Sequence, residues 1–512
     1  IEASKALRFL IEVEGAETTL LPVLPQLLTE YFRIMTEIGN DEVVAALQVI
    51  IDKFGDHIEP HAVALVTQLS VAFENYCSTG EDDDDAAMAA AQCLECIATV
   101  LKGICERPDL YKSMEPQLVP LVLQILGNDG AFIEYLEYAL DILTFLTYFP
   151  DEISPQLWEA FPLIYVAFDQ WAFDYLNLMV PPLENFIAKS PQQFLAGTSQ
   201  TPEGTVSYID LVFSMVAKTV AEDRSSENEC RKALSLYMSI LHSCGGSVDA
   251  YLPMMNDITL AKLGQQVNNE VPLTRIAIFQ VIGSALYYNP QLELAELEKR
   301  GVTQQVFAQW VQDAEQMEKW LPRKLTVLGL TSILMLPASQ LPASISASVP
   351  QLISAVVSMT EKMKEEAEKE GNEEDDEEDF EEEPEEYDDD EEGFDEDEDV
   401  TNETDEMYMD ALNQLSNGGG DAVARFLIGE DWDTDYDDDD DDFVSPLDEV
   451  DTLLYVNDTL KAAFQREPEV YQRVQAALPP ETVNTCQNLF AAADAQRRAQ
   501  EAAQQQQQQP SA

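Results

Sequence analysis

The feature that most constrains the fold of this chain is a series of apolar stripes with helical spacing. Apolar residues recur at steps of three and four positions, which places them on one face of a helix. The first stripes consist of Leu20, Leu24, Leu27, Leu28, Tyr31, Ile34, Met35 and Ile38, then Val43, Leu47, Ile50, Ile51 and Phe54, then Ala62, Leu65, Val66, Leu69, Phe73 and Tyr76. The alternation that is typical of strands is absent, so the sequence predicts an all-α protein.

The stripes also repeat at a longer interval. Taken in pairs, the expected first helices start near residues 18, 59, 114 and 155, in steps of about 41, 55 and 41 residues, close to the 40–47 residues of HEAT repeats. The longest step contains an acidic insert at residues 81–85. Further helices are expected from Val206, Asn228, Val248 and Val271, with Ser226 and Glu229 at capping-box spacing. Residues 1–335 are therefore predicted to form a HEAT-repeat superhelical solenoid, a right-handed stack of helix pairs.

A dense acidic tract interrupts this pattern. Between Gly371 and Asp410 there are 26 Asp and Glu residues and no Lys, Arg or His. Such a run repels itself and offers little apolar surface to bury, so we expect a disordered acidic insertion that attracts basic molecules.

The expected division of the chain follows from these changes in composition. We assign residues 336–370 to the last repeat helix region, 371–404 to the disordered acidic tract and 405–430 to weak helices with a Gly-rich linker. A second acidic cluster covers 431–444, helices cover 445–503, and a polar tail covers 504–512. Ser445, Pro446 and Asp448 carry helix-start signals ahead of an apolar stripe at Val450, Leu453, Leu460 and Phe464.

The charge balance indicates the class of partner. The formal net charge is −69, of which residues 361–450 carry −40. This field repels phosphate backbones and anionic lipid surfaces and attracts Lys- and Arg-rich proteins, so we expect neither direct nucleic-acid binding nor membrane binding. Seven scattered cysteines indicate reduced thiols, and no stretch approaches a signal peptide or membrane span. We expect an intracellular chain that begins inside a longer protein, because Ile1 lies within an amphipathic pattern.

Motifs for metal binding or catalysis are incomplete. Cys93 and Cys96 form a CxxC without a second ligand pair, and Pro60 separates His57 and Glu59 from His61. Residues 431–442 begin like a calcium loop, but Tyr436 stands where such a loop needs Gly. The chain contains only three histidines, so few residues are available for general-base catalysis. We expect no enzyme activity, no cofactor and no metal.

Aromatic residues embedded among the carboxylates favour a binding role for the acidic segments. An aromatic ring beside carboxylates can bind Lys or Arg by cation-π contact together with ion pairing. The candidate cargo-binding residues are Asp375, Asp376, Asp379, Phe380, Tyr387, Asp388, Asp389, Asp390, Phe394, Asp431, Trp432, Asp433 and Tyr436. The alternative interpretation is a segment that only solvates the chain. Trp158, Trp171, Trp310 and Trp320 lie in helical stripes and are expected in the core.

Several ordered sequence blocks resemble the importin-beta superfamily, in particular its importin seven and eight branch. They are DEVVAALQVIIDKFG at 41–55, ISPQLWEAFPLIYVAF at 153–168, FDYLNLMVPPLENF at 173–186, ALYYNP at 285–290, RKLTVLGL at 323–330 and GEDWDTDYDDDDDD at 429–442. Their order is similar to that in the C-terminal half of such a receptor. The tail departs from those relatives because it ends in Gln and Pro-Ser-Ala.

The resemblance implies a nuclear transport receptor that shuttles between cytoplasm and nucleus through nuclear pores. The implied partners are basic cargo such as ribosomal proteins or histones, Phe-Gly nucleoporins, importin beta, and Ran GTPase, which such receptors bind mainly through N-terminal repeats that have no counterpart here. Two alternatives remain open. One is a HEAT-repeat scaffold of another complex, such as a phosphatase or chromosome complex, and the other is an acidic histone chaperone.

Overall fold

The computed structural model describes residues 8–378 and 445–507, except for 12, 14–15, 39–40, 79–83, 106, 202–203, 266–272, 315–316 and 318. The chain divides into two units. The first consists of Ile1–Glu366 together with Val444–Ala512, and the second is Ala367–Phe443, most of which lies outside the described residues.

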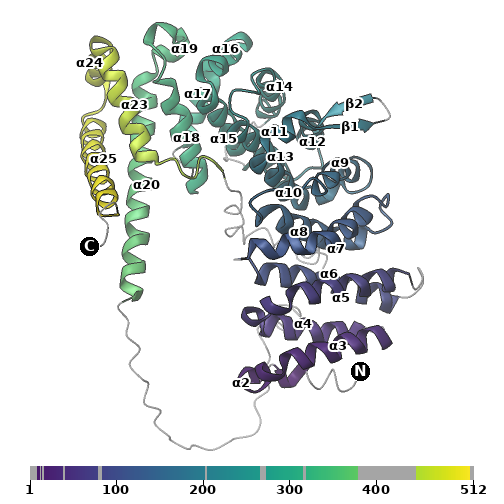
Figure 1. Ribbon diagram of the computed structural model, residues 1–512. Helices are drawn as coiled ribbons and strands as arrows, with labels where there is room; N and C mark the ends of the chain where they lie inside the picture. Colours follow the sequence, from purple (N-terminus) through teal and green to yellow (C-terminus); the bar gives the residue numbers. More distant parts are fainter. Residues whose placement is uncertain are drawn as a thin grey trace, which may run out of the picture. The chain divides into compact units, whose positions relative to one another are not determined.

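The first unit is built from two parallel rows of helices (Figure 1). In each row, successive helices pack against each other, and the helices from α3 to α15 also pair with a helix of the other row. One row contains α3 (Leu24–Ile38), α5 (Ala62–Cys77), α7 (Pro108–Leu126), α9 (Ala160–Gln170), α12 (Tyr208–Ala221) and α14 (Leu252–Leu263). The other contains α4 (Asp41–Lys53), α6 (Asp84–Gly103), α8 (Leu136–Tyr148), α10 (Leu176–Lys189), α13 (Glu227–Ser243), α15 (Leu273–Tyr288) and α18 (Trp320–Ile333). The all-α solenoid expected from the stripes is confirmed.

The pair α5 and α6 illustrates how the stripes build these rows. Helix α5 buries Leu65, Leu69 and Phe73, and α6, which packs against it, buries small residues such as Ala89 and Cys93. Small side chains on one helix let the two backbones approach closely, and burying each large apolar side chain stabilises the pair by about 1.5–3 kcal/mol. The paired helices thus depend on each other for their apolar faces.

Further elements connect or flank the rows. They are α2 (Ala16–Leu20), α11 (Pro191–Ala196), α16 (Pro290–Arg300), α17 (Thr303–Ala314) and α19 (Ala343–Ser346), with 3-10 turns η1 (Leu21–Val23), η2 (Gly55–His57), η3 (Glu59–His61), η4 (Ile133–Tyr135), η5 (Leu157–Glu159), η6 (Phe173–Tyr175) and η7 (Ala338–Gln340). The predicted capping box is present at the start of α13, where Ser226 and Glu229 bond each other's backbone N–H groups.

A small β-hairpin was not predicted. Strands β1 (Thr198–Thr201) and β2 (Gly204–Ser207) pair antiparallel between α11 and α12. The segment is polar and short, so it lacks the apolar alternation that identifies a strand. Gly197 precedes it because a Cβ there would lie 2.2 Å from the ring of Tyr208, which stacks on Phe161.

Two other expectations about single residues and helices were wrong. Trp320 is 48% exposed rather than buried, because it stands at the first position of α18, ahead of the residues that face the neighbouring helices. Residues 85–103 of α6 are long and apolar enough for a membrane span by length and composition, although no such stretch was expected. Half of that window is buried within the protein, as is typical of a core helix.

The described chain ends with four helices: α20 (Val349–Glu378), α23 (Thr452–Arg466), α24 (Pro468–Ala477) and α25 (Pro480–Gln507). Helix α20 continues to Glu378, eight residues into the tract that was expected to be disordered from residue 371. Glu and Lys have high helix propensity, so the helix can continue after its apolar stripe has ended. Residues 379–404 of the tract lie outside the described residues.

We predict that Gly283 and Gly329 control how closely α15 and α18 pack. A Cβ on Gly329 would lie 2.5 Å from the Cα of Gly283, and one on Gly283 would lie 2.8 Å from the carbonyl oxygen of Leu325. Gly283→Ala or Gly329→Ala should therefore push the two helices apart and reduce the free energy of unfolding by about 1–3 kcal/mol in urea titrations. Gly245→Ala, at an exposed glycine with open space around it, is the control. Equal stability of all three variants would contradict this account.

Candidate functional site at the ends of the acidic insertion

Buried and partly buried polar contacts join successive helices of the row that contains α4 and α18. They include Gln48 with Thr99, Asn185 with Thr147, Glu184 with Ser235 and Ser239, and His242 with Ser284. Each contact spans 38 to 55 residues along the chain. Since buried polar groups need specific partners, these contacts fix the register in which one helix meets the next.

The same kind of contact joins α18 to α23. The hydroxyl groups of Ser332 and Tyr455 lie 2.9 Å apart across a sequence separation of 123 residues. The intervening chain includes Ala367–Phe443, the 77 residues of the second unit. Without them the separation would be 46 residues, within the range of the other contacts. Helix α23 is therefore the next member of the row, and the acidic insertion interrupts a repeat between α20 and α23 (Figure 1).

Arg323 of α18 holds the chain just before the insertion. The residue is 8% exposed, and its guanidinium donates to the carbonyl oxygen of Met317 at 2.6 Å and forms an ion pair with Glu366 of α20. One terminal nitrogen contacts both oxygens of that carboxylate while Nε satisfies the backbone acceptor. Charge-assisted contacts of this kind fix α20 relative to α18 at this point.

Lys324, the next residue of α18, holds the chain just after the insertion. It is 1% exposed, and its ammonium donates to the carbonyl oxygen of Asp448 at 3.1 Å and lies 4.4 Å from the ring centre of Trp320. Burial lowers the pKa of Lys324, and the nearby carboxylates of Asp448 and Asp451 counteract this. Adjacent basic residues of one helix thus fasten the two chain ends that flank the insertion.

The return segment, residues 445–451, forms a turn and not the helix start expected at Ser445. Asp448 accepts from the N–H of Ser445 at 2.6 Å, while Asp451 caps α23 by accepting from the N–H of Leu454. The Ser445 hydroxyl lies 2.9 Å from Nδ1 of His242, and Nε2 of that ring lies 2.9 Å from the Ser284 hydroxyl. Burial lowers the pKa of His242 to about 3, so the ring is neutral near pH 7.

The end of α23 is fastened to the end of α18. Arg466 donates to the carbonyl oxygens of Leu334, Met335 and Leu336, each at 2.8 Å. These carbonyls follow the last turn of α18, where a cation both satisfies free acceptors and favours the helix dipole. The helices after the insertion are consequently held at both ends of α18.

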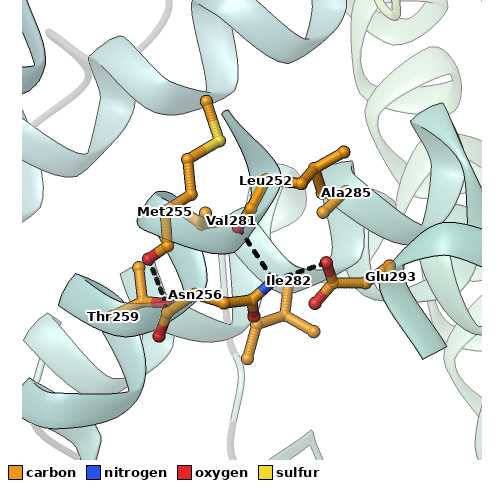
Figure 2. Close-up of a pocket in the computed structure, with 8 residues that line it drawn as sticks. All are labelled: Leu252, Met255, Asn256, Thr259, Val281, Ile282, Ala285 and Glu293. Carbon is orange, nitrogen blue, oxygen red and sulfur yellow. Dashed lines mark hydrogen bonds between the residues drawn. The ribbon is translucent and has the colours of Figure 1, made fainter. Parts of the chain in front are cut away.

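A buried acid lies in a small pocket among α14, α15 and α16 (Figure 2). Glu293 accepts a hydrogen bond from the Asn256 amide at 2.7 Å, and Asn256 also donates to the Leu252 carbonyl oxygen. The second carboxylate oxygen of Glu293 has no hydrogen-bond partner among the described residues. Burial raises the pKa of Glu293 to about 7, and the Asn256 hydrogen bond opposes the shift.

The structure leaves most of the predicted cargo-binding residues undescribed. The backbone of Asp375 and Asp376 lies in the last turns of α20, and no position is described for their side chains. Asp379, Phe380, Tyr387, Asp388, Asp389, Asp390, Phe394, Asp431, Trp432, Asp433 and Tyr436 lie outside the described residues. These assignments remain predictions.

The structure describes the residues of the CxxC motif and of the histidine cluster near residue 60. Cys93 and Cys96 are buried on α6, where burial raises the pKa of Cys93 far above its usual range. Glu59 pairs with Arg107, and His57 and Glu59 lie on separate 3-10 turns. Within the described part of the chain, no group of three His, Cys, Asp or Glu side chains is placed to hold a metal.

Comparison with known proteins identifies the class of this solenoid. Residues 110–427 match the family described as "Importin-11-like, TPR repeats", and both TPR and HEAT units are paired helices. The fold is similar to a structure described as "The exportin Cse1 in its cargo-free, cytoplasmic state", with a TM-score of 0.58 at 11% identity, covering 96% of this chain and 46% of that one. That similarity shows the fold alone.

The chain belongs to the importin-beta superfamily, in the importin seven and eight branch. It is 32% identical to the "Importin beta-like SAD2 homolog" of Arabidopsis thaliana over 358 residues, which cover 67% of this chain and 34% of that protein. It is 28% identical to the "Probable importin-7 homolog" of Dictyostelium discoideum, over 66% of this chain and 31% of that protein. The chain spans about a third of the length of these relatives.

We predict that Lys324→Met loosens the return segment. The substitution keeps the apolar stem and removes the donor to the Asp448 carbonyl, so amide hydrogen exchange in residues 445–451 should become roughly tenfold faster, as expected for the loss of about 1.4 kcal/mol. Lys112→Met, at an exposed position on α7, is the control. Unchanged exchange in Lys324→Met would show that this hydrogen bond does not hold the segment.

We predict that Glu293 makes the protein less stable as the pH rises. The folded-state pKa of about 7 exceeds the ordinary value of 4.5, so the folded state binds the proton more tightly, and its stabilising effect is lost as the pH rises from 4.5 through 7. Glu293→Gln stays neutral. We compare the free energy of unfolding of this variant with that of wild type. The difference should favour the variant by roughly 3 kcal/mol more at pH 8 than at pH 4. Urea titrations at both values measure this, with exposed Glu152→Gln as the control; an identical pH profile for Glu293→Gln and wild type would refute it.

Proposed function

We propose that the protein is a nuclear transport receptor that carries basic protein cargo between cytoplasm and nucleus. The observation that supports this most strongly is the match to the importin family over residues 110–427, which runs through the helical rows into the acidic insertion. Relatives of the same branch are themselves named as importins. Enzymatic activity is not part of the proposal.

The acidic insertion is the proposed cargo-binding element. Its carboxylates carry most of the charge of the segment 361–450, and its aromatic residues add cation-π partners for Lys and Arg. Arg323 and Lys324 fasten both flanking ends to α18, which supports a segment tethered at two points. Two tethers limit how far the insertion extends and raise its effective concentration near the helical rows.

Ran GTPase, Phe-Gly nucleoporins and importin beta are proposed as further partners on the basis of family membership. A pull-down of the full-length protein with GTP-bound Ran, compared with GDP-bound Ran, tests the first of these. Loss of bound basic cargo on addition of GTP-bound Ran supports an import receptor. Cargo binding that is unchanged by GTP-bound Ran favours a histone chaperone or a scaffold.

We predict that carboxylates and aromatic residues of the insertion affect cargo binding differently. Replacing Asp by Asn at Asp375, Asp376, Asp379, Asp388, Asp389, Asp390, Asp431 and Asp433 should weaken binding of a core histone and flatten its dependence on salt, because exposed charges are screened over about 8–10 Å. Replacing Phe380, Tyr387, Trp432 and Tyr436 by Ser should weaken binding by about two- to fivefold for each ring that stacks on a cargo cation, and should keep the salt slope. Fluorescence titrations at several salt concentrations measure both.

The matched control neutralises the same number of acids outside the insertion. Exposed positions suitable for Gln or Asn are Glu74, Glu95, Glu137, Glu152, Glu159, Asp223, Glu469 and Glu481. If this control loses as much affinity as the variant in the insertion, the charge of the whole chain attracts cargo, and the insertion has no special part in binding.

A further inference from the structure

Ser445 is the residue at which the described chain resumes after the insertion, and its hydroxyl is the central contact of the return segment. The oxygen accepts from the N–H of Leu447 at 3.1 Å and lies 2.9 Å from Nδ1 of His242. The side chain is 4% exposed, as is that of Leu447. One hydroxyl therefore joins the turn itself to α13 and, through the imidazole, to Ser284 of α15.

The sequence around Ser445 contains two recognition features for protein kinases. Pro446 follows it directly, the feature read by proline-directed kinases, and Asp448 stands three positions after it, the feature read by acidophilic kinases. Asp437 to Asp442, just before, add further negative charge that acidophilic kinases favour. We propose that Ser445 is a phosphorylation site and that its phosphorylation releases the return segment from α13 and α18.

The chemical step is an ordinary phosphoryl transfer from ATP, supplied by the kinase. The Ser445 Oγ attacks the γ-phosphorus, the bond from that phosphorus to the oxygen bridging to the β-phosphate breaks, and ADP leaves. The hydroxyl proton passes to a base of the kinase. The product is a phosphate ester with a charge of about −1.5 to −2 near pH 7.

A phosphate at this position is incompatible with the contacts that hold Ser445. The ester oxygen has no proton to donate, and the dianion would be placed beside the neutral imidazole of His242 and the carboxylate of Asp448, which bonds the Ser445 N–H. Burying an uncompensated charge is strongly unfavourable and outweighs the few hydrogen bonds that the segment supplies. Release exposes the phosphate to water and frees Lys324 and His242.

Access for a kinase requires only local opening. Residues 445–451 contain no regular helix, since α23 begins at Thr452. The Arg466 contacts to the end of α18 are separate from the segment, so it can detach while α23 stays docked. Such short segments open at a small fraction of the free energy of global unfolding.

The experiment treats the full chain with ATP and either an acidophilic or a proline-directed kinase, maps phosphate by mass spectrometry, and measures amide hydrogen exchange. We expect phosphate on Ser445 and, by an order-of-magnitude estimate, at least roughly tenfold faster exchange in residues 445–451, with α5 and α6 unchanged. Phosphatase treatment should restore slow exchange. Ser445→Ala, checked for folding by far-UV circular dichroism, should abolish the phosphate-dependent change.

Three outcomes would overturn the proposal. They are the absence of phosphate on Ser445 with both kinases, phosphorylation that leaves exchange in the return segment unchanged, and phosphorylation that slows exchange. The last would indicate that a protonated His242 or Lys324 pairs with the phosphate and tightens the segment. Because the readout is the return segment itself, the result does not depend on whether the insertion binds basic cargo.

Discussion

Every helix of the two rows depends on a neighbour to cover its apolar stripe. Helix α5 packs against α6 and buries Leu65, Leu69 and Phe73, and the contact of Gly283 with Gly329 brings α15 directly against α18. Apolar contacts alone tolerate sliding along the helix axis. The polar contacts from one helix to the next, such as Asn185 with Thr147 and His242 with Ser284, remove that freedom because each pair of polar groups meets in only one register.

This arrangement explains how a repeat accommodates a long acidic insertion. Only neighbouring helices must meet, so chain added between α20 and α23 leaves the contacts of α18 with α23 intact. The entropy cost of closing a loop rises only with the logarithm of its length, about 0.6 kcal/mol for each doubling. That entropy cost is offset by contacts at the two ends of the insertion. They are the hydrogen bonds of Arg323, Lys324 and Arg466 and the apolar contacts of α23.

Local signals in the sequence identified the elements, whereas contacts across the chain were not predictable. Stripe spacing located the helices near Val206, Asn228 and Val248, and the capping box fixed the start of α13. The return of α23 to the row after the insertion depends on residues 123 positions apart, which no local pattern reports. The structural roles of Arg323, Lys324 and His242 were not predicted, because a cation or a histidine within an apolar stripe has no sequence signature until its partner is known. Ser445 and Asp448 did carry a capping signal, but it closes a turn rather than opening a helix.

The use of basic residues is informative in so acidic a chain. Only 28 Lys and Arg residues face 97 Asp and Glu residues, yet Arg323 and Lys324 are buried on adjacent positions of α18 and bind, respectively, a carboxylate and a backbone carbonyl. A buried cation is costly unless it is paired and hydrogen-bonded, and each of these two has such partners at the anchor. The end before the insertion is thus anchored through one carboxylate, that of Glu366, whereas the end after it is anchored through a backbone carbonyl, with the carboxylates of Asp448 and Asp451 near the Lys324 ammonium.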